Sequence, residues 1–303
     1  MDILPQILVN GIIQGSIYAL IALGLSLIYG VLRFMNFAHG EMAMLGAYFY
    51  YYFFIVLGWP IIPSVLLAIF FCGIAGILFN KLIFQPLRKE SEWTLLITSI
   101  GAAIFIKSLV LLIATGKARN YTRGDYAPTV YSLFDGKMII TNYQVLIIIT
   151  TLAILIGLAF FLKYSKTGKS IRAVSDNMDV AAILGINVKS TITKIFIIST
   201  CIAGVAGILI GYEQSLTPNM GLLLSIAAFS AVIVGGLGSI WGAVVGGMLI
   251  GIIQNLAVGL DWWGYSIPTN YKTAVGYAIL ILMLLFRPRG LFGAKLEEEA
   301  GRK

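Results

Sequence analysis

Residues 214–260 form a run of 47 residues without a single Asp, Glu, Lys or Arg. Two further uncharged runs occupy positions 3–32 and 42–80. A membrane-spanning helix needs about 20 mostly apolar residues, so each run can cross a bilayer at least once. Only 11% of the chain is charged and 59% is hydrophobic, whereas a soluble domain carries about 25% charged residues. The sequence therefore predicts an all-α polytopic membrane protein and excludes a soluble enzyme, a secreted disulfide scaffold and a nucleic-acid binder.

Glycine and proline divide the uncharged runs into separate spans. Residues 42–80 are too long for one helix and are expected to break at 58–60, while 214–260 is expected to fold back near 235–238. The first run forms one span, and further spans are expected at 93–116, 138–162, 195–212 and 268–286, the last with Lys272 snorkelling near its end. We expect about eight or nine transmembrane helices in a single domain over residues 1–303. A re-entrant 214–260 region would leave seven full crossings.

The basic residues indicate the orientation. With nine crossings, 15 of the 21 Lys and Arg residues fall on one side, which is cytoplasmic by the positive-inside rule. The C-terminus is then cytoplasmic and the N-terminus, which has no basic stretch typical of a signal peptide, lies outside. Eight crossings would place both termini on one side. In this orientation residues 117–141 form an external loop and residues 163–194 a cytoplasmic segment.

Polar residues inside the spans are candidates for a transport pathway, because they are costly in lipid and usually face the protein interior. Asn10, Gln14 and Tyr18 recur at four-residue steps and therefore share one face of the first helix. The spacing fits a lumen-facing stripe and hydrogen bonding between helices equally well.

The segment that follows the first span carries Asn36, His39 and Glu41, and His39 is the single histidine of the chain. No second His or Cys stands near it at ligand spacing, so we predict no metal site. His39 and Glu41 are candidates for a proton relay in the pathway. The alternative is that the three side chains bond to the backbone where two helices meet.

The cytoplasmic segment is predicted to contain two short helices, the first over 170–174. Asp176 is the expected N-cap of the second helix, Asp179 lies in its first turn, and Gly185 ends it in a left-handed conformation. Its small residues form a stripe suited to a groove on a partner protein, although packing on the chain's own membrane part fits equally well. This stripe consists of Met178, Ala181, Ala182 and Gly185.

The same segment contains Gly168-Lys169-Ser170, which matches the end of a phosphate-binding loop. That loop needs a glycine five residues before its second glycine, and position 163 is Lys. We therefore predict that this chain does not bind nucleotide itself.

Three motifs together resemble the branched-chain amino acid ABC transporter permeases of the LivH type. Residues 18–30 (YALIALGLSLIYG) with 35–41 (MNFAHGE) are similar to the family's first-span signature, and 235–242 (GGLGSIWG) to its late glycine-rich motif. The coupling segment of the family is matched by Gly168, Arg172-Ala173-Val174, Asn177, Ala181 and Leu184-Gly185-Ile186. The resemblance extends over about residues 3–292.

The resemblance implies an ABC importer permease fold in a bacterial or archaeal inner membrane, without a cofactor. It implies a second related permease subunit, in a heterodimer, two cytoplasmic ATP-binding subunits and an external substrate-binding protein. The chain would then be no enzyme, since ATP is hydrolysed by its partners. Its coupling residues would be Gly168, Arg172, Asp176, Asp179, Ala181, Ala182 and Gly185.

The default substrates of such a permease are leucine, isoleucine and valine; urea, short amides and other amino acids are alternatives. A secondary transporter is a rival function, but beyond Lys107 and the His39–Glu41 pair the spans contain almost no residues that could couple an ion. A membrane enzyme would need a metal cluster or an activated nucleophile, and we find neither pattern in the sequence.

Overall fold

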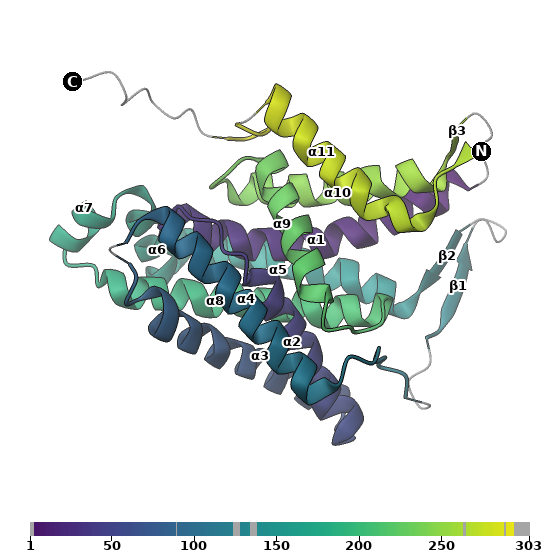
Figure 1. The fold of residues 1–303 in the computed structure, drawn as a ribbon, viewed down its shortest axis with the longest axis horizontal. Coiled ribbons are helices and arrows are strands. Elements are labelled where there is room, and N and C mark those ends of the chain that lie inside the picture. Colours follow the sequence, from purple (N-terminus) through teal and green to yellow (C-terminus); the bar gives the residue numbers. More distant parts are fainter. Residues whose placement is uncertain are drawn as a thin grey trace.

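The computed structural model describes residues 3–88, 90–123, 128–133, 138–262, 265–287 and 289–293, and these are largely helical (Figure 1). The α-helices are α1 (Leu4–Leu32), α2 (His39–Tyr51), α3 (Ile61–Phe79), α4 (Glu92–Ala114), α5 (Asn142–Tyr164), α6 (Lys166–Asp176), α7 (Met178–Ile183), α8 (Val188–Glu213), α9 (Met220–Gly235), α10 (Ile240–Gly259) and α11 (Lys272–Phe286). The π-helical turns η1 (Tyr52–Val56) and η2 (Asn80–Phe84) continue α2 and α3, and the 3-10 turn η4 (Thr269–Tyr271) leads into α11.

Two short antiparallel hairpins lie outside the helical bundle. β1 (Val130–Leu133) pairs with β2 (Met138–Thr141), with Val130 opposite Thr141, and β3 (Asp261–Trp262) pairs with β4 (Tyr265–Ser266). β2 leads directly into α5, so the predicted span at 138–162 begins four residues later than expected, at Asn142. Thr141 caps this helix in a capping box with Gln144, which fixes the start of α5 at that point.

Each of the nine predicted spans corresponds to a helix. Within the described residues, seven helical stretches are long and apolar enough to cross a membrane, namely α1, α3 with η2, α4, α5, α8, α10 and η4 with α11. The 16-residue α9 is shorter than a full span, and α2 has 13 residues before η1 continues it. The predicted breaks are confirmed, since α2 and α3 are separated around Gly58, and α9 and α10 around residues 236–239.

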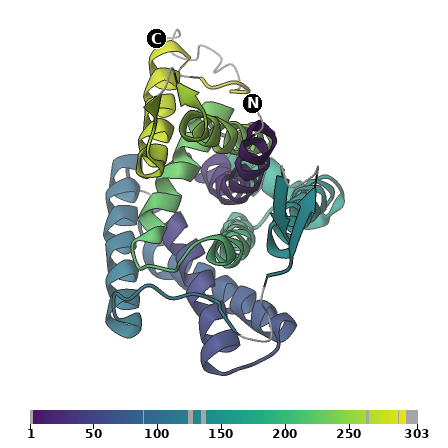
Figure 2. The same ribbon diagram turned by 90° about the vertical axis from the view of Figure 1, so that its right-hand side faces the viewer.

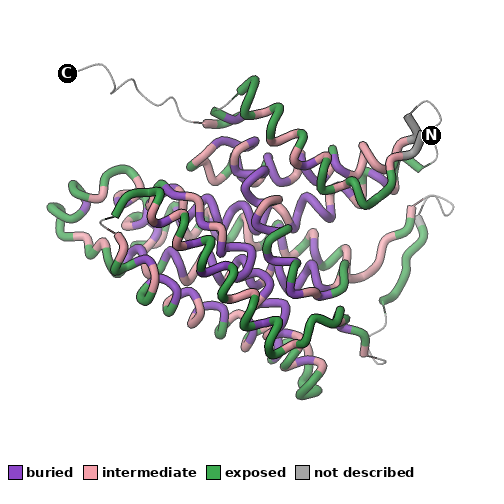
Figure 3. Tube along the Cα trace, in the orientation of Figure 1, coloured by how far each residue is buried: buried purple, intermediate pink, exposed green. Residues whose placement is uncertain are grey.

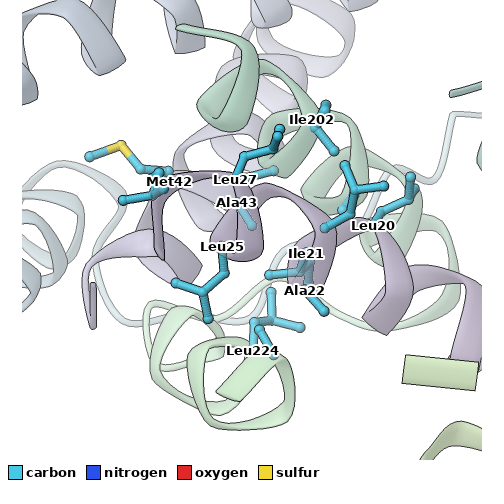
Figure 4. Close-up of a cluster of buried hydrophobic side chains, with 14 of the residues drawn as sticks. Leu20, Ile21, Ala22, Leu25, Leu27, Met42, Ala43, Ile202 and Leu224 are labelled. Carbon is cyan, nitrogen blue, oxygen red and sulfur yellow. The ribbon is translucent and has the colours of Figure 1, made fainter. Parts of the chain in front are cut away.

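Helix α1 lies at the centre of the bundle (Figures 2 and 3). Of its apolar 18-residue stretch 83% is buried, against 22% for α4 and for α5 and 6% for α11. Its buried side chains form one cluster with those of α2, α8 and α9, which includes Leu25, Met42, Ile202 and Leu224 (Figure 4). Helices α4, α5 and α11 therefore expose most of their apolar surface on the outside of the bundle.

Glycine lets α10 lie directly against α1. Gly251 faces the backbone of Gly15, and Gly247 faces the backbone of Ala19, so a β-carbon on either glycine would collide with α1. Helices α2 and α8 meet in the same way, because Gly207 faces the carbonyl group of Ala43. Lipid offers no hydrophobic drive for helices to associate, so close backbone packing is a main source of their attraction. These small-residue faces are used within the chain.

Helices α2 and α9 both begin inside the bundle. His39, the first residue of α2, packs against Gly24, which lies eight residues before the end of α1, a depth of about 12 Å at 1.5 Å per residue. The N-terminal turns of the two helices touch: the amide of Gly40 donates to Ser225 Oγ at 3.0 Å, and Ser225 Oγ donates to the Phe37 carbonyl at 2.8 Å. Serine thus satisfies backbone groups that lipid could not.

Candidate substrate pathway and coupling surface

A cavity of about 250 Å³ lies between α1, α9, α10 and α11, and we call it the outer cavity. Its walls are apolar on the α9 side, where Met220, Leu223 and Leu224 face it. Polar side chains come from the other helices and from the end of α9, namely Gln14, Tyr18, Ser230, Gln254, Lys272 and Thr273. Such a mixture of an apolar wall and a few convergent polar groups is typical of a small-molecule site.

Three of these polar groups come from three different helices, α1, α10 and α11. Lys272 Nζ donates to Gln14 Oε1 at 3.4 Å, which links α11 to α1. Gln254 is only 3% exposed, and its Oε1 atom has no hydrogen-bond partner. Gly276 leaves the room that the Gln254 amide occupies, since a β-carbon there would collide with Nε2. A buried acceptor without a partner is costly, so it marks a place where a ligand group can bind.

The predicted stripe on the first helix is divided by the structure. Gln14 and Tyr18 line the outer cavity, as a lumen-facing stripe requires. Asn10, one turn further toward the N-terminus, is half-buried and accepts a hydrogen bond from Gln6 Nε2 at 3.0 Å. It does not line this cavity.

Asn36, His39 and Glu41 lie apart from the outer cavity. All three are at most 2% exposed and surround the start of α2. Asn36 Oδ1 accepts from the amide of Ala38 at 3.1 Å, as expected if this residue bonds to the backbone where two helices meet. Glu41 packs against Gly221 of α9, whose opposite face borders the outer cavity. A pathway role for these three residues stays a prediction.

Two residues of the outer cavity were missed as site residues by sequence reasoning. Lys272 was expected to snorkel at a span end, and it instead turns toward α1. Gln254 and the adjacent Asn255 are amides in an otherwise apolar stretch of the long uncharged run, and this was a signal that could have identified Gln254.

A wider cavity of about 490 Å³ lies where α5 begins and α8 ends, next to the segment 120–123, and shares Gln214 and Ser215 with the outer cavity. Tyr121 anchors this segment, because its hydroxyl donates to the Ala47 carbonyl at 3.0 Å and its ring packs against Gly211. Burial raises the pKa of Tyr121 well above its ordinary value, so the hydroxyl stays protonated and remains a donor. The segment 120–123 is thus fixed to the bundle on one side of this cavity.

The segment 163–194, predicted to be cytoplasmic, contains α6 and α7, and each of these helices begins with a side-chain cap. Ser165 Oγ accepts from the Gly168 amide at 2.8 Å, so the first helix starts earlier than the predicted 170–174. Asn177 Oδ1 accepts from the amides of Asp179 and Val180, both at 3.0 Å. The predicted N-cap, Asp176, is wrong: it is the last residue of α6, while Asn177 has the extended backbone that a cap requires.

The predicted coupling residues divide into two that are buried and five that are exposed. Gly168 is buried against the backbone of Leu162, and Ala181 is 2% exposed, so both pack inside the chain. Arg172, Asp176, Asp179, Ala182 and Gly185 are exposed. The predicted left-handed stop is confirmed, since Gly185 has a φ of 83°.

Sequence reasoning missed the most exposed apolar residues of this segment. Val180, Ile183 and Leu184 are 50%, 83% and 73% exposed, and together they form what we call the α7 tip. The signal in the sequence was an Ile-Leu pair at the end of a helix that was expected to lie outside the membrane. Exposed apolar clusters of this kind mark interaction surfaces.

Comparison with known proteins gives a consistent result. Residues 7–284 match the family described as "Branched-chain amino acid transport system / permease component". The chain is 35% identical to the high-affinity branched-chain amino acid transport system permease protein BraD of Pseudomonas aeruginosa, with 95% of each chain covered. It is 33% identical to LivH of Escherichia coli, again over 95% of each, and 32% identical to a probable LivH of Methanocaldococcus jannaschii, over 95% of this chain and 92% of that protein.

Proposed function

The chain belongs to the family of permease components of branched-chain amino acid transport systems, and from this we propose that it is the membrane subunit of an ATP-driven importer of leucine, isoleucine and valine. The observation that carries the proposal is the identity of 33–35% over 95% of the chain to relatives named as high-affinity permeases for these amino acids. The relatives are transport permeases, and in our proposal ATP is hydrolysed by two separate cytoplasmic subunits.

The α7 tip supports the proposal that partner ATPases bind on the cytoplasmic side. It presents apolar side chains at the end of a capped helix, which is the chemistry of a helix seated in a groove. We assign contact with the ATPase to the exposed residues Arg172, Asp179, Ala182 and Gly185 together with this tip. Gly168 and Ala181 would act indirectly by holding α6 and α7 in position.

On the outer side we propose docking of a substrate-binding protein, which delivers its cargo toward the outer cavity. The wide cavity beside segment 120–123 offers it a fixed surface with exposed polar groups. In this orientation the N-terminus is outside and the C-terminus cytoplasmic, which the excess of basic residues supports. A second, related permease subunit would complete the pathway.

Uptake competition tests the proposed substrates. The chain is expressed with its partner permease, ATPase and binding-protein subunits in cells that lack their own leucine uptake, and entry of radiolabelled L-leucine is measured. We expect excess isoleucine or valine to compete and urea to have no effect. Uptake of urea or acetamide without uptake of leucine would contradict the proposal.

A further inference from the structure

We propose that the outer cavity holds the amino acid in transit by its α-carboxylate, with Lys272 as the cationic partner of that group. The inference rests on the proposed function and names the chemistry by which the pathway would recognise its substrate. It follows from four features of the cavity: its charge, the two helix ends at its border, an unpartnered buried amide and the apolar wall opposite.

The electrostatics of the outer cavity favour an anion. Lys272 is its charged lining residue, and no Asp or Glu is found among the described residues that line it. Glu213 acts on Lys272 from the rim, but its carboxylate already accepts from Gln144 Nε2 at 3.3 Å. The Lys272 ammonium is bound only loosely by Gln14, at 3.4 Å, so a carboxylate can displace this contact.

Two helix N-termini border the same space. α9 begins at Met220, and the continuous helix of η4 and α11 begins at Thr269; neither start is satisfied by a side-chain cap. The first amide groups of a helix carry a partial positive charge and bind anions. Helices that begin within the membrane present this charge to anionic substrate groups in transporters. The N-terminal ends of α9 and η4 therefore add to the attraction exerted by Lys272.

Gln254 supplies the complementary acceptor for the other end of an amino acid. Its Oε1 atom is unpartnered and the residue is 97% buried, so its free energy improves when a ligand ammonium donates to it. No carboxylate among the described lining residues competes for that ammonium. The site thus pairs the substrate carboxylate with a full positive charge on Lys272, but it offers the substrate ammonium only the neutral amide of Gln254. This difference keeps binding weak enough for release.

The size and the apolar wall of the cavity suit a branched side chain. About 250 Å³ is below the range of roughly 300–1,000 Å³ that sites for drug-sized ligands occupy. Met220, Leu223 and Leu224 line it from α9, opposite the polar groups of α1 and α10. A small zwitterion with an aliphatic side chain satisfies both walls.

Substitution of Lys272 tests the proposal in the complete transporter. In proteoliposomes containing all subunits and saturating leucine-loaded binding protein, we expect Lys272→Met to lower leucine uptake by about tenfold, the factor of one charge-assisted hydrogen bond. Lys272→Arg should retain most uptake. Lys117→Met, an exposed lysine outside the cavity, is the matched control and should behave as the original protein. Co-purification of the subunits should be unchanged in all three.

Chemical restoration of the positive charge at position 272 distinguishes a role of Lys272 in substrate recognition from a purely structural role. Lys272→Cys, with Cys72 and Cys201 replaced by Ala, is treated with a reagent that adds an aminoethylthio group or with one that adds a neutral methylthio group. We expect only the cationic group to restore uptake. Equal uptake by Lys272→Met and the original protein, or equal restoration by both reagents, would overturn the proposal.

The variant Gln254→Leu is a second test of the proposal, which remains decisive if the Lys272 variants fail to assemble. It keeps the volume of the side chain but removes the acceptor, and we expect leucine uptake to fall while subunit assembly persists. Unchanged uptake in Gln254→Leu would then overturn the proposal. A complete transporter that takes up a different substrate but no leucine would instead contradict the proposed function.

Discussion

Single glycines decide how closely the helices of this protein approach one another. The α2–α8 contact depends on Gly46, which faces the backbone of Gly204, and on Gly207, which faces the backbone of Ala43, each with no room for a β-carbon. Other glycines carry no such constraint: around Gly157 on α5 no atom lies within 4 Å of an added β-carbon. The residue type alone therefore does not reveal its role, and the neighbouring backbone does.

Substitution of Gly207 is expected to loosen the α2–α8 contact. Gly207→Ala places a methyl group against the Ala43 carbonyl, and overpacking of this kind costs about 1–3 kcal/mol. Gly157→Ala should leave stability unchanged or raise it slightly, because alanine favours the helix. Thermal unfolding in detergent checks both variants. Equal melting temperatures for the two would show that the close contact is absent.

At the scale of elements, the caps of α6 and α7 determine which residues the segment 163–194 exposes. Asn177 begins α7 one residue later than the sequence suggested, and the turn of the helix then directs Ala181 inward. The same rotation brings Ile183 and Leu184 to the surface. The composition of the segment predicted a docking helix, but which face is exposed depends on packing against α6 and α8.

Removal of the α7 cap should weaken this helix selectively. Asn177→Ala loses two amide contacts of 3.0 Å, a change that costs about 1 kcal/mol, whereas Asp176→Ala removes no cap. Hydrogen exchange of the α7 amides should therefore accelerate in Asn177→Ala and stay unchanged in Asp176→Ala. Faster exchange in Asp176→Ala than in Asn177→Ala would instead identify Asp176 as the cap of α7.

Polar substitution of the α7 tip should uncouple the transporter without unfolding it. In Ile183→Ser with Leu184→Ser, the exposed apolar surface is lost outside the membrane, so we expect co-purification of the ATPase subunits and leucine uptake both to fall. Lys169→Ser, at another exposed position, is the control. Ala181→Trp should instead lower stability, since Ala181 is buried within the chain. Unchanged co-purification in the double variant would mean that the ATPases bind elsewhere.

For the whole molecule, hydropathy predicted where helices form but not which one is central. The stretch in α5 has a mean hydropathy of 3.0 and is only 22% buried, while α1, at 1.9, is 83% buried. Lipid-facing helices must be apolar, whereas a central helix can carry glycine and polar residues because protein surrounds it. The outer cavity was likewise beyond sequence reasoning, since Lys272 and Gln14 are 258 positions apart and meet only in the folded bundle.

Labelling of introduced cysteines tests the orientation of the bundle. With Cys72 and Cys201 replaced by Ala, Asn120→Cys should react with an impermeant thiol reagent added outside intact cells. Lys169→Cys should react only after the membrane is opened. Reaction of both positions from the same side would contradict the assigned number of crossings.

Reconstitution of the chain alone and with its partners tests most directly that it is a passive pathway driven by separate ATPases. Proteoliposomes are prepared with this chain by itself, and with the second permease, the ATPase subunits, ATP and leucine-loaded binding protein. Leucine accumulation is then followed with and without ion gradients. We predict concentrative uptake only in the complete, ATP-supplied system. Concentrative uptake by the chain alone, driven by a proton or sodium gradient, would contradict the account and identify a secondary transporter.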